Sequence, residues 1–365
     1  MIPVSKPNIG KEEQRAVLEA IKSGFISSKG KFIQEFETKF ANYCNKKNGI
    51  ATANGTVALH LALRALNVKK GDEVIVPDLT FIAVANAVTY CNAKSVFVDS
   101  HPEYWCINPE KIEEKITSRT KAIIPVHLYG HPCDMDPIRD IAEDHGLYVI
   151  EDASEAHGAE YKGKKIGSFG HISCFSFYGN KIITTGEGGI CLTNDEDLAE
   201  KMKILRDHGM NPSRRYWHDV VGFNYRMTNM QAAIGVAQLK RIEDFIQKKR
   251  KIAIWYEKGL KELEEKELIK LHPEMSWAKC VYWMYSILIK EKYHFSRDEL
   301  ILKLDKSQIE TRPFFYPIHI MPPYKCEVES PTAEELSMKG INLPSGVDLT
   351  GKNIKDILLA ICYDT

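Results

Sequence analysis

The chain has 365 residues, of which 44% are hydrophobic and 27% charged, a balance typical of a soluble globular protein large enough for two domains. Lys plus Arg and Asp plus Glu both number 49, so the charge balance gives no reason to expect a nucleic-acid or anionic-membrane partner. The start lacks a signal-peptide pattern, and polar residues interrupt the most apolar region, 81–98, so we expect no membrane span. Nine cysteines without a Cys-x-x-Cys pair favour reduced thiols in the cytoplasm.

Helices and strands alternate along the first two thirds of the chain. Amphipathic or crowded apolar segments predict helices at 12–23, 33–43 and 55–66. Short apolar runs predict strands at 73–77, 95–99, 122–126, 147–152, 172–177 and 189–193, with helices at 81–90 and 137–145 between some of them. Because these strands are continuously apolar, they predict an α/β fold whose mainly parallel sheet is covered by helices on both faces.

The last third of the chain has a different pattern. A long helical region at 230–263 precedes a strand at 283–289 and a helix at 297–304. We place a domain boundary in the long helical region, near residue 240. The sequence thus predicts a large domain at 1–240 and a smaller C-terminal α+β domain at 241–365.

Functional groups in open α/β sheets gather at the carboxyl ends of the strands, where a first candidate feature is Asn54-Gly55-Thr56. This small turn leads directly into a predicted helix. Backbone N–H groups and the helix dipole favour a phosphate there, and the Thr56 hydroxyl adds a donor. A simple helix cap is the alternative interpretation, and for this motif alone it is the commoner one.

A second feature is Asp152, which ends a predicted buried strand. Because an unpaired buried carboxylate is costly, Asp152 needs a partner. A protonated pyridine nitrogen would serve, and a salt bridge to a nearby Arg or Lys is the alternative. Glu155, three residues further on, can face the same cavity if the turn is helical.

The third feature is Ser176 with Lys181, a hydroxyl and an amine beyond one strand and before a glycine-rich turn. Most lysines are solvated surface charges, but a partly desolvated lysine loses its proton more easily and becomes a nucleophile toward a carbonyl. An anion cradle, a carboxylate and an amine together fit pyridoxal 5′-phosphate (PLP). Phe81 can stack on the ring of that cofactor, or it can be an ordinary core residue.

Metal and dinucleotide chemistry find less support. His127, His131 and Asp134 form the best group of metal-ligand types, but no further histidine or cysteine set completes it, so we expect no metal site. The chain also contains no Gly-x-Gly-x-x-Gly fingerprint and no phosphate-loop motif.

Five motifs in this order resemble the nucleotide-sugar aminotransferases, a family of fold-type I PLP enzymes, over nearly the whole chain. They are Asn-Gly-Thr at 54–56, Glu-Asp-Ala-Ser-Glu-Ala-His-Gly-Ala at 151–159, Phe-Ser-Phe at 175–177 followed by Lys181, Thr-Thr-Gly-Glu-Gly-Gly at 184–189, and Phe-Asn-Tyr-Arg-Met-Thr-Asn at 223–229.

The resemblance implies a role for each residue of the site. Lys181 would bind the cofactor covalently and later move a proton between the sugar C4 and the cofactor. Asp152 would pair with the ring nitrogen, and Phe81 would stack on the ring. Further roles would fall to Gly55, Thr56 and Ser176 at the phosphate, to Glu155 near the ring hydroxyl, and to Asn224 at the phosphate of a neighbouring subunit. A homodimer or a larger assembly, with the site at the subunit interface, would follow.

The resemblance also implies the substrates. Segments 25–28, 126–130, 179–189, 214–217 and 319–324 are most similar to members that transfer the amino group of L-glutamate to a GDP-linked 4-keto-6-deoxy sugar. A sister dehydratase has His in place of the lysine, so Lys181 favours transamination. A UDP- or dTDP-linked keto sugar and a non-catalytic regulatory role remain alternatives. Arg214, Arg215, Arg312 and His319 are hypotheses for diphosphate or sugar contacts, with ordinary surface charge as the alternative.

Overall fold

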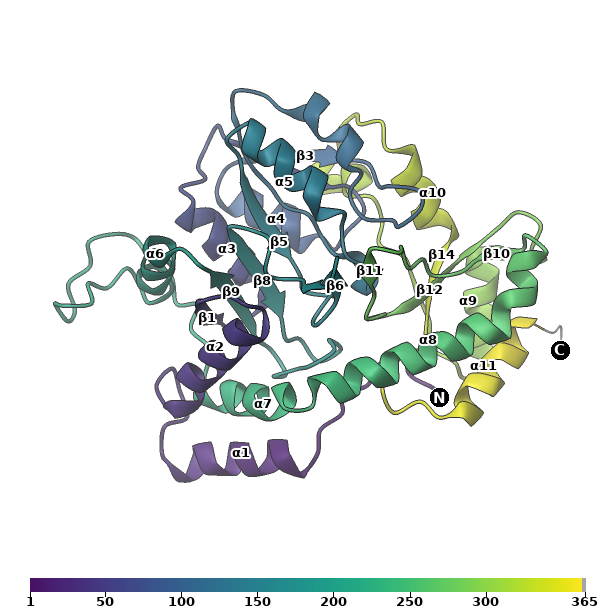
Figure 1. Ribbon diagram of the computed structural model, residues 1–365, viewed down its shortest axis with the longest axis horizontal. Coiled ribbons are helices and arrows are strands. Elements are labelled where there is room, and N and C mark those ends of the chain that lie inside the picture. Colours follow the sequence, from purple (N-terminus) through teal and green to yellow (C-terminus); the bar gives the residue numbers. More distant parts are fainter. Residues whose placement is uncertain (363–365) are drawn as a thin grey trace.

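A seven-stranded sheet forms the centre of the larger part of the molecule, with strands in the order β1-β9-β8-β5-β4-β2-β3 (Figure 1). The computed structural model describes residues 1–362. The strands of this sheet are β1 (Asn48–Thr52), β2 (Glu73–Pro77), β3 (Lys94–Val98), β4 (Thr120–Ile123), β5 (Tyr148–Asp152), β8 (Ile172–Ser176) and β9 (Gly189–Thr193). Strands β8, β5, β4, β2 and β3 pair in parallel, whereas β9 is antiparallel to both β8 and β1. The prediction of an α/β fold with a mainly parallel sheet is confirmed.

Helices cover both faces of this sheet because successive side chains of each strand point to opposite sides. In β2, for example, Ile75 belongs to one hydrophobic cluster, and Val74 and Val76 belong to the other. The first cluster includes side chains of α1 (Lys11–Lys22), α2 (Lys31–Tyr43), α5 (Met135–Asp144) and α7 (Asn229–Leu239). The second includes side chains of α3 (Gly55–Ala65), α4 (Ala83–Tyr90) and α6 (Glu196–Arg206).

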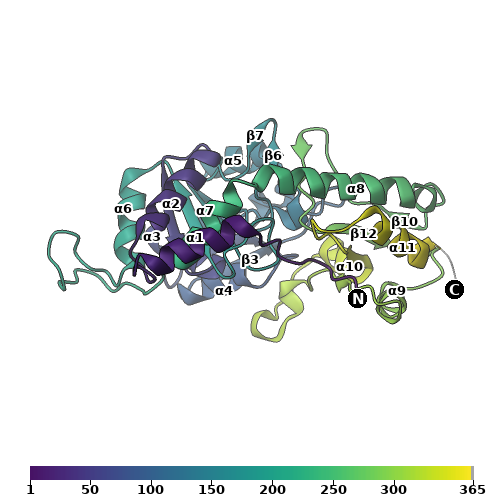
Figure 2. The same ribbon diagram turned by 90° about the horizontal axis from the view of Figure 1, so that it is seen from below.

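The C-terminal part is built on a four-stranded antiparallel sheet in the order β10-β12-β14-β13, and α8 extends along it (Figure 2). Its elements are α8 (Ile242–Glu265), β10 (Ile269–Lys270), β12 (Tyr285–Ile289), α9 (Arg297–Lys306), β13 (Arg312–Pro313), α10 (Pro331–Lys339), β14 (Gly340–Leu343) and α11 (Gly351–Cys362). A third sheet joins β6 (Glu160–Tyr161) to β7 (Lys164–Lys165) and β11 (Ala278–Lys279). Short 3-10 turns lie at Pro109–Lys111, Glu113–Lys115, Leu128–Gly130, Ile318–Ile320 and Pro322–Tyr324.

The long helix predicted at 230–263 is in fact two helices, α7 and α8, separated at Lys240 and Arg241. At the break, the Arg241 guanidinium turns toward the N-terminal region and binds the Glu13 carboxylate at 2.8 Å. Within residues 1–362, no helix has both the length and the apolar character that crossing a membrane requires.

The N-terminal residues pair with the C-terminal part. Ile2 forms a parallel bridge with Ile309, and the Val4 N–H donates to the Glu310 carboxylate at 3.0 Å. The Ser345 N–H donates to the Val4 carbonyl at 2.7 Å. These contacts, and the pairing of β11 with β6, cross the predicted boundary at residue 240, which itself stays a prediction.

Candidate active site

Three elements meet where strands β5 and β8 end and helix α3 begins. Asp152 is the last residue of β5, Ser176 is the last residue of β8, and Gly55 is the first residue of α3. The Asn54 side chain caps the helix by accepting the Val57 N–H at 3.0 Å. A Cβ atom on Gly55 would lie only 2.7 Å from Ser176 Cβ, so a glycine is needed for this close approach. The helix start, with half-buried Thr56, thus lies against the Ser176 hydroxyl, a geometry suited to an anion.

Lys181 lies in the connection between β8 and β9 with its amine enclosed. The side chain is 11% exposed, and Nζ lies 3.7 Å from Glu155 Oε1. The same Nζ lies 3.8 Å from the centre of the Trp283 ring. Burial lowers the pKa of Lys181 below its usual 10.5, although the negative charges of Glu155 and Asp152 oppose this shift. Lowering the pKa of an amine increases the fraction that is an uncharged nucleophile.

Glu155 is the counterpart of this amine. Its Oε2 accepts the Tyr129 N–H at 2.8 Å. Burial raises the pKa of Glu155 to about 7, against the charge of Lys181 and the hydrogen bond from Tyr129, which lower it. Lys181 and Glu155 therefore form a pair in which each charge favours the other, against the burial that favours the neutral form of both groups.

The Asp152 carboxylate is buried, and its Oδ1 accepts the Ser154 N–H at 3.0 Å. No Lys, Arg or His of residues 1–362 lies within ion-pair distance of it, so the alternative of a local salt bridge is wrong. A buried carboxylate with so few partners can receive a cationic N–H donor, such as a protonated ring nitrogen. The residues present thus fit PLP at the phosphate end and at the ring nitrogen.

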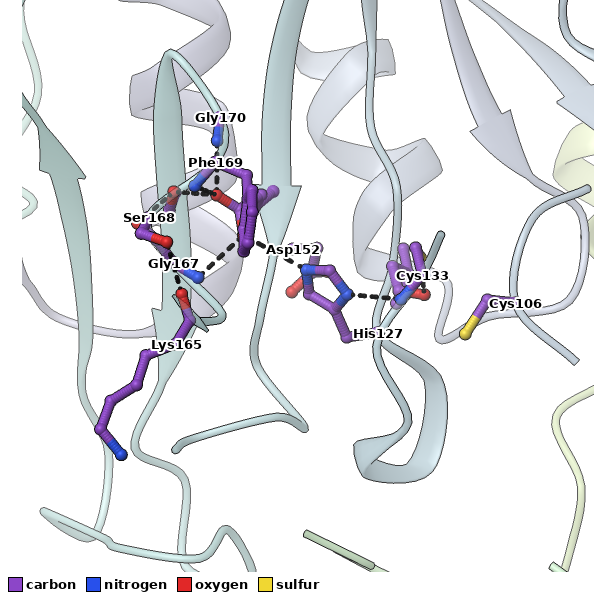
Figure 3. A network of polar contacts seen from close by, with 12 residues as sticks. Cys106, His127, Cys133, Asp152, Lys165, Gly167, Ser168, Phe169 and Gly170 are labelled. Carbon is purple, nitrogen blue, oxygen red and sulfur yellow. Dashed lines mark hydrogen bonds and ion pairs between the residues drawn. The ribbon is translucent and has the colours of Figure 1, made fainter. Parts of the chain in front are cut away.

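Glu151, the neighbour of Asp152, points to the other side of β5 and has a structural role. Its carboxylate accepts the N–H groups of Gly167 and Phe169 at 2.8 and 2.7 Å, the Gly170 N–H, and the Ser173 hydroxyl at 2.8 Å. Figure 3 shows these backbone groups converging beside Asp152 and His127. Burial would raise the pKa of Glu151, but the hydrogen bond and charge of His127, the charge of Lys46 and the backbone donors together lower it to about 2.

Phe81 lies beyond the carboxyl end of β2 and is 55% exposed, so its interpretation as a core residue is wrong. Its ring is 5.8 Å from that of Phe315, in a tilted arrangement. His319 is buried near the same strand end, where its Nδ1 lies 2.6 Å from the Asp78 carboxylate. Asp78 also accepts the His319 backbone N–H at 2.9 Å, so this imidazole is held in a fixed orientation.

The remaining predicted residues do not join this cluster. Arg214 and Arg215 belong to the segment 207–228, which extends away from the body of the molecule (Figures 1 and 2). Their guanidinium carbons lie 4.1 Å from the ring centre of Trp217 and 4.8 Å from that of Tyr216. Asn224 is exposed near the base of this segment and accepts hydrogen bonds from Arg226 at 2.9 and 3.0 Å.

Arg312, on β13, is also exposed, and it pairs with Glu310 at 3.3 Å. The His127, His131 and Asp134 group does not form a metal site: His127 Nδ1 accepts the Cys133 N–H at 3.0 Å, and its other nitrogen faces Glu151 at 3.4 Å. Across residues 1–362, no set of three or more His, Cys, Asp or Glu side chains is placed to hold a metal ion.

Sequence reasoning missed Trp283 and Tyr129, which border the lysine and the glutamate. Trp283 stands in a run of apolar residues that reads as a buried strand, and nothing local distinguishes it. Tyr129 belongs to the motif Val-His-Leu-Tyr-Gly, whose only signal was the family resemblance. The backbone φ of Tyr129 is 52°, a left-handed conformation that is uncommon for a bulky residue and that marks a constrained position.

An aminotransferase from Psychrobacter cryohalolentis has the same fold: the two structures superpose with a TM-score of 0.92, at 35% identity, over 98% of this chain and 97% of that one. The fold of this chain is therefore that of an aminotransferase. The chain belongs to the DegT/DnrJ/EryC1/StrS aminotransferase family, whose model matches residues 7–362.

Two relatives named GDP-perosamine synthase are similar over almost their full length. The protein from Caulobacter vibrioides is 51% identical over 99% of this chain and 97% of its own. The protein from Escherichia coli O157:H7 is 49% identical over 97% of this chain and 95% of its own.

Proposed function

We propose that this aminotransferase uses PLP to move the amino group of L-glutamate to C4 of GDP-4-keto-6-deoxy-D-mannose, giving GDP-perosamine and 2-oxoglutarate. The observation that carries the proposal is the enclosed Lys181 amine, 3.7 Å from Glu155 and beside the buried Asp152 carboxylate. The GDP-linked substrate is supported by the two relatives named GDP-perosamine synthase.

The residues that would hold PLP are those already brought together. Gly55, Thr56 and Ser176 would bind its phosphate, Asp152 its ring nitrogen, and Phe81 one face of its ring. When bound, PLP supplies an electron sink that stabilises negative charge at the carbon that loses a proton. The Asp152 carboxylate would accept a hydrogen bond from the protonated ring nitrogen and so sustain that property.

The chain's own groups would then handle the protons. Lys181 Nζ would carry a proton between the reacting carbon of the substrate and the cofactor. The Glu155 carboxyl, whose pKa lies near 7, would hold a proton close to Nζ and to the cofactor hydroxyl. Glutamate and the sugar nucleotide would enter the same pocket in turn, so we expect ping-pong kinetics.

We further propose a homodimer in which Asn224 of each chain completes the site of its partner. Large apolar side chains are exposed near this residue, including Tyr216 at 73% and Val221 at 84%. Helix α7, which directly follows the segment that carries them, is tied to the α1–α2 connection, because the side chain of its first residue, Asn229, donates to the Phe25 carbonyl at 2.7 Å. Phe25 and Ile26 are exposed too, so a second chain has an apolar surface to cover here.

In this dimer Arg214 and Arg215 would approach the diphosphate of a sugar nucleotide bound to the partner, while Arg312 and His319 would be contributed in cis. We also propose a cytoplasmic location, because all nine cysteines are free thiols.

The test is a half-reaction followed by a comparison of substrates. The purified protein with PLP is expected to be yellow and to bleach on addition of L-glutamate, and the aminated enzyme to convert the GDP-linked 4-keto sugar faster than UDP- or dTDP-linked ones. Lys181→Ala should abolish bleaching, whereas Lys162→Ala, at an exposed lysine paired with Asp136, should not. Preference for a UDP or dTDP sugar would refute the substrate, and bleaching by Lys181→Ala would refute the role of the lysine.

A further inference from the structure

Trp283, from the C-terminal part of the chain, contacts the lysine loop at two points. Its ring centre lies 3.8 Å from Lys181 Nζ. Its Nε1–H donates to the Asn180 carbonyl at 2.8 Å, so the side chain is fixed to the backbone next to the lysine. The ring is almost fully buried, and it stacks on Tyr129 with a centroid distance of 6.3 Å and an interplanar angle of 18°.

The backbone of Trp283 is held by a second buried lysine. Lys249 Nζ, on α8, donates to the Trp283 carbonyl at 2.8 Å and to the Ser345 carbonyl at 2.7 Å. The Ser345 hydroxyl in turn accepts the Tyr285 N–H at 2.7 Å. Burying a lysine is costly, and here it joins two segments of the C-terminal part at the point where one of them reaches Lys181.

The opposite side of the segment is equally constrained. A Cβ atom on Gly130 would lie 2.7 Å from the Trp283 backbone nitrogen, and the Val281 N–H donates to the Gly130 carbonyl at 3.1 Å. The loop that supplies Tyr129 to Glu155 therefore lies directly against the segment that supplies Trp283 to Lys181.

We propose that Trp283 is a positioning residue for Lys181: its indole ring closes one side of the amine and keeps Nζ beside Glu155, within reach of the reacting carbon. This inference rests on the proposed role of Lys181. The ring attracts the ammonium form through its π face and excludes water from the amine. Misplacing a reacting group by about 1 Å costs on the order of a hundredfold in rate. We therefore expect the indole ring of Trp283 to affect the rate of proton transfer by Lys181 rather than the affinity for the substrate.

The first experiment measures the lysine itself, without turnover. The full chain, freed of PLP, is treated with acetic anhydride at a series of pH values, and acylation of Lys181 is followed by mass spectrometry. In Trp283→Leu the limiting acylation rate at high pH is expected to rise by about tenfold, because the amine loses its cover. Trp283→Phe keeps a ring but loses the hydrogen bond to Asn180, and it should give a smaller increase.

The second experiment uses the PLP-loaded enzyme and the glutamate half-reaction. In Trp283→Leu the rate constant should fall by about tenfold or more, with the Kd for glutamate changed by less than about twofold. Trp255→Leu is the matched control, because Lys251 Nζ lies 5.1 Å from the Trp255 ring centre on α8, and both readouts should stay at the wild-type values.

The inference would be overturned if Lys181 were acylated at the wild-type rate in both Trp283 variants. It would also be overturned if Trp255→Leu changed the acylation rate and the half-reaction rate as much as Trp283→Leu does. If Trp283→Leu does not fold, Trp283→Phe is the only variant tested. A wild-type acylation rate of Lys181 in that variant would then overturn the inference. Acylation does not require a sugar nucleotide, so a failure of the proposed substrate would leave this result intact.

Discussion

At the scale of single residues, the charged groups of the site shift one another's pKa values. Lys181 is buried next to two carboxylates, of which Glu155 has a raised pKa and Asp152 has no basic residue of the described chain within ion-pair distance. Burial favours the neutral amine, and the carboxylates favour the ammonium. The protonation of Lys181 is therefore set by two opposing influences, burial and the neighbouring carboxylates.

Replacing Glu155 by Gln should lower the pKa of Lys181 further. The negative charge of Glu155 is a main influence that raises this pKa against burial, and the amide removes it while still accepting the Tyr129 N–H. The midpoint of the pH dependence of Lys181 acylation in the PLP-free chain should therefore move to lower pH. Glu160→Gln, on the remote β6, should not move it, and a midpoint that rises in Glu155→Gln would contradict the assignment.

Replacing Gly55 by Ala should weaken PLP binding by about ten- to a hundredfold, because overpacking of about 1–3 kcal/mol falls directly on the phosphate cradle. The added Cβ would lie 2.7 Å from Ser176 Cβ, and the helix start would have to move away. Gly351→Ala is the control, since that glycine also begins a helix, α11, but has open space around it. Equilibrium titration of each PLP-free variant with PLP gives its Kd. Equal Kd values for Gly55→Ala and Gly351→Ala would contradict the proposed binding of the phosphate at the start of α3.

At the scale of elements, β5 places two adjacent carboxylates in opposite roles. Glu151 accepts hydrogen bonds from backbone donors of 167–170 and fixes that loop, while Asp152 is the carboxylate proposed to bind the cofactor. The alternation of the strand thus separates a structural carboxylate from the one proposed to bind the cofactor.

Glu151 should make the free energy of unfolding decrease as the pH falls into the acid range. Its pKa is lowered from 4.5 to about 2 on folding, so it contributes stability above pH 4.5 that is lost as the pH falls from 4.5 toward 2. The shift corresponds to about 3 kcal/mol. Denaturant unfolding at several pH values between 7 and 3 should show a difference between wild type and Glu151→Gln that is largest at neutral pH. A difference that is constant across this range would contradict the role, and Glu114→Gln, at an exposed position, should show none.

Prediction from sequence succeeded where the signal was local. The strands β2 and β9 match their predicted bounds, and Lys181, Glu155 and Asp152 do lie together. Strand β1 was not predicted because two of its five residues, Asn48 and Gly49, are uncommon in strands. Its hydrogen-bonding partner is β9, which lies far along the chain. Trp283 could not be found because its contact with Lys181 joins distant parts of the chain, and no local pattern records such a pairing.

At the scale of the whole molecule, three of the predicted site residues belong to one exposed segment. The segment 207–228, which includes Arg214, Arg215 and Asn224, extends away from the body of the molecule (Figure 1). An isologous dimer would place each copy of this segment against the other subunit and close two sites at once.

Mixing two inactive variants tests this arrangement. Lys181→Ala and Asn224→Ala, unfolded and refolded together, should recover about a quarter of the wild-type activity, because half of the dimers are mixed and each has one intact site. Lys181→Ala mixed with Asp152→Ala should recover none, since both residues act in the same chain. No recovery in the first mixture would contradict a shared site.

The pairing of the first residues with the last third of the chain has a consequence for biosynthesis. Val4 leaves the ribosome early, but its partner Ser345 is added 341 positions later. At about 5–20 residues per second, that interval lasts roughly 20–70 s. During this time the N-terminal segment, whose Pro7 lies near the lysine loop at Gly179, has no strand to join. The native pairing of Val4 with Ser345 can therefore form only after Ser345 has been added, later than all strands of the seven-stranded sheet have been made.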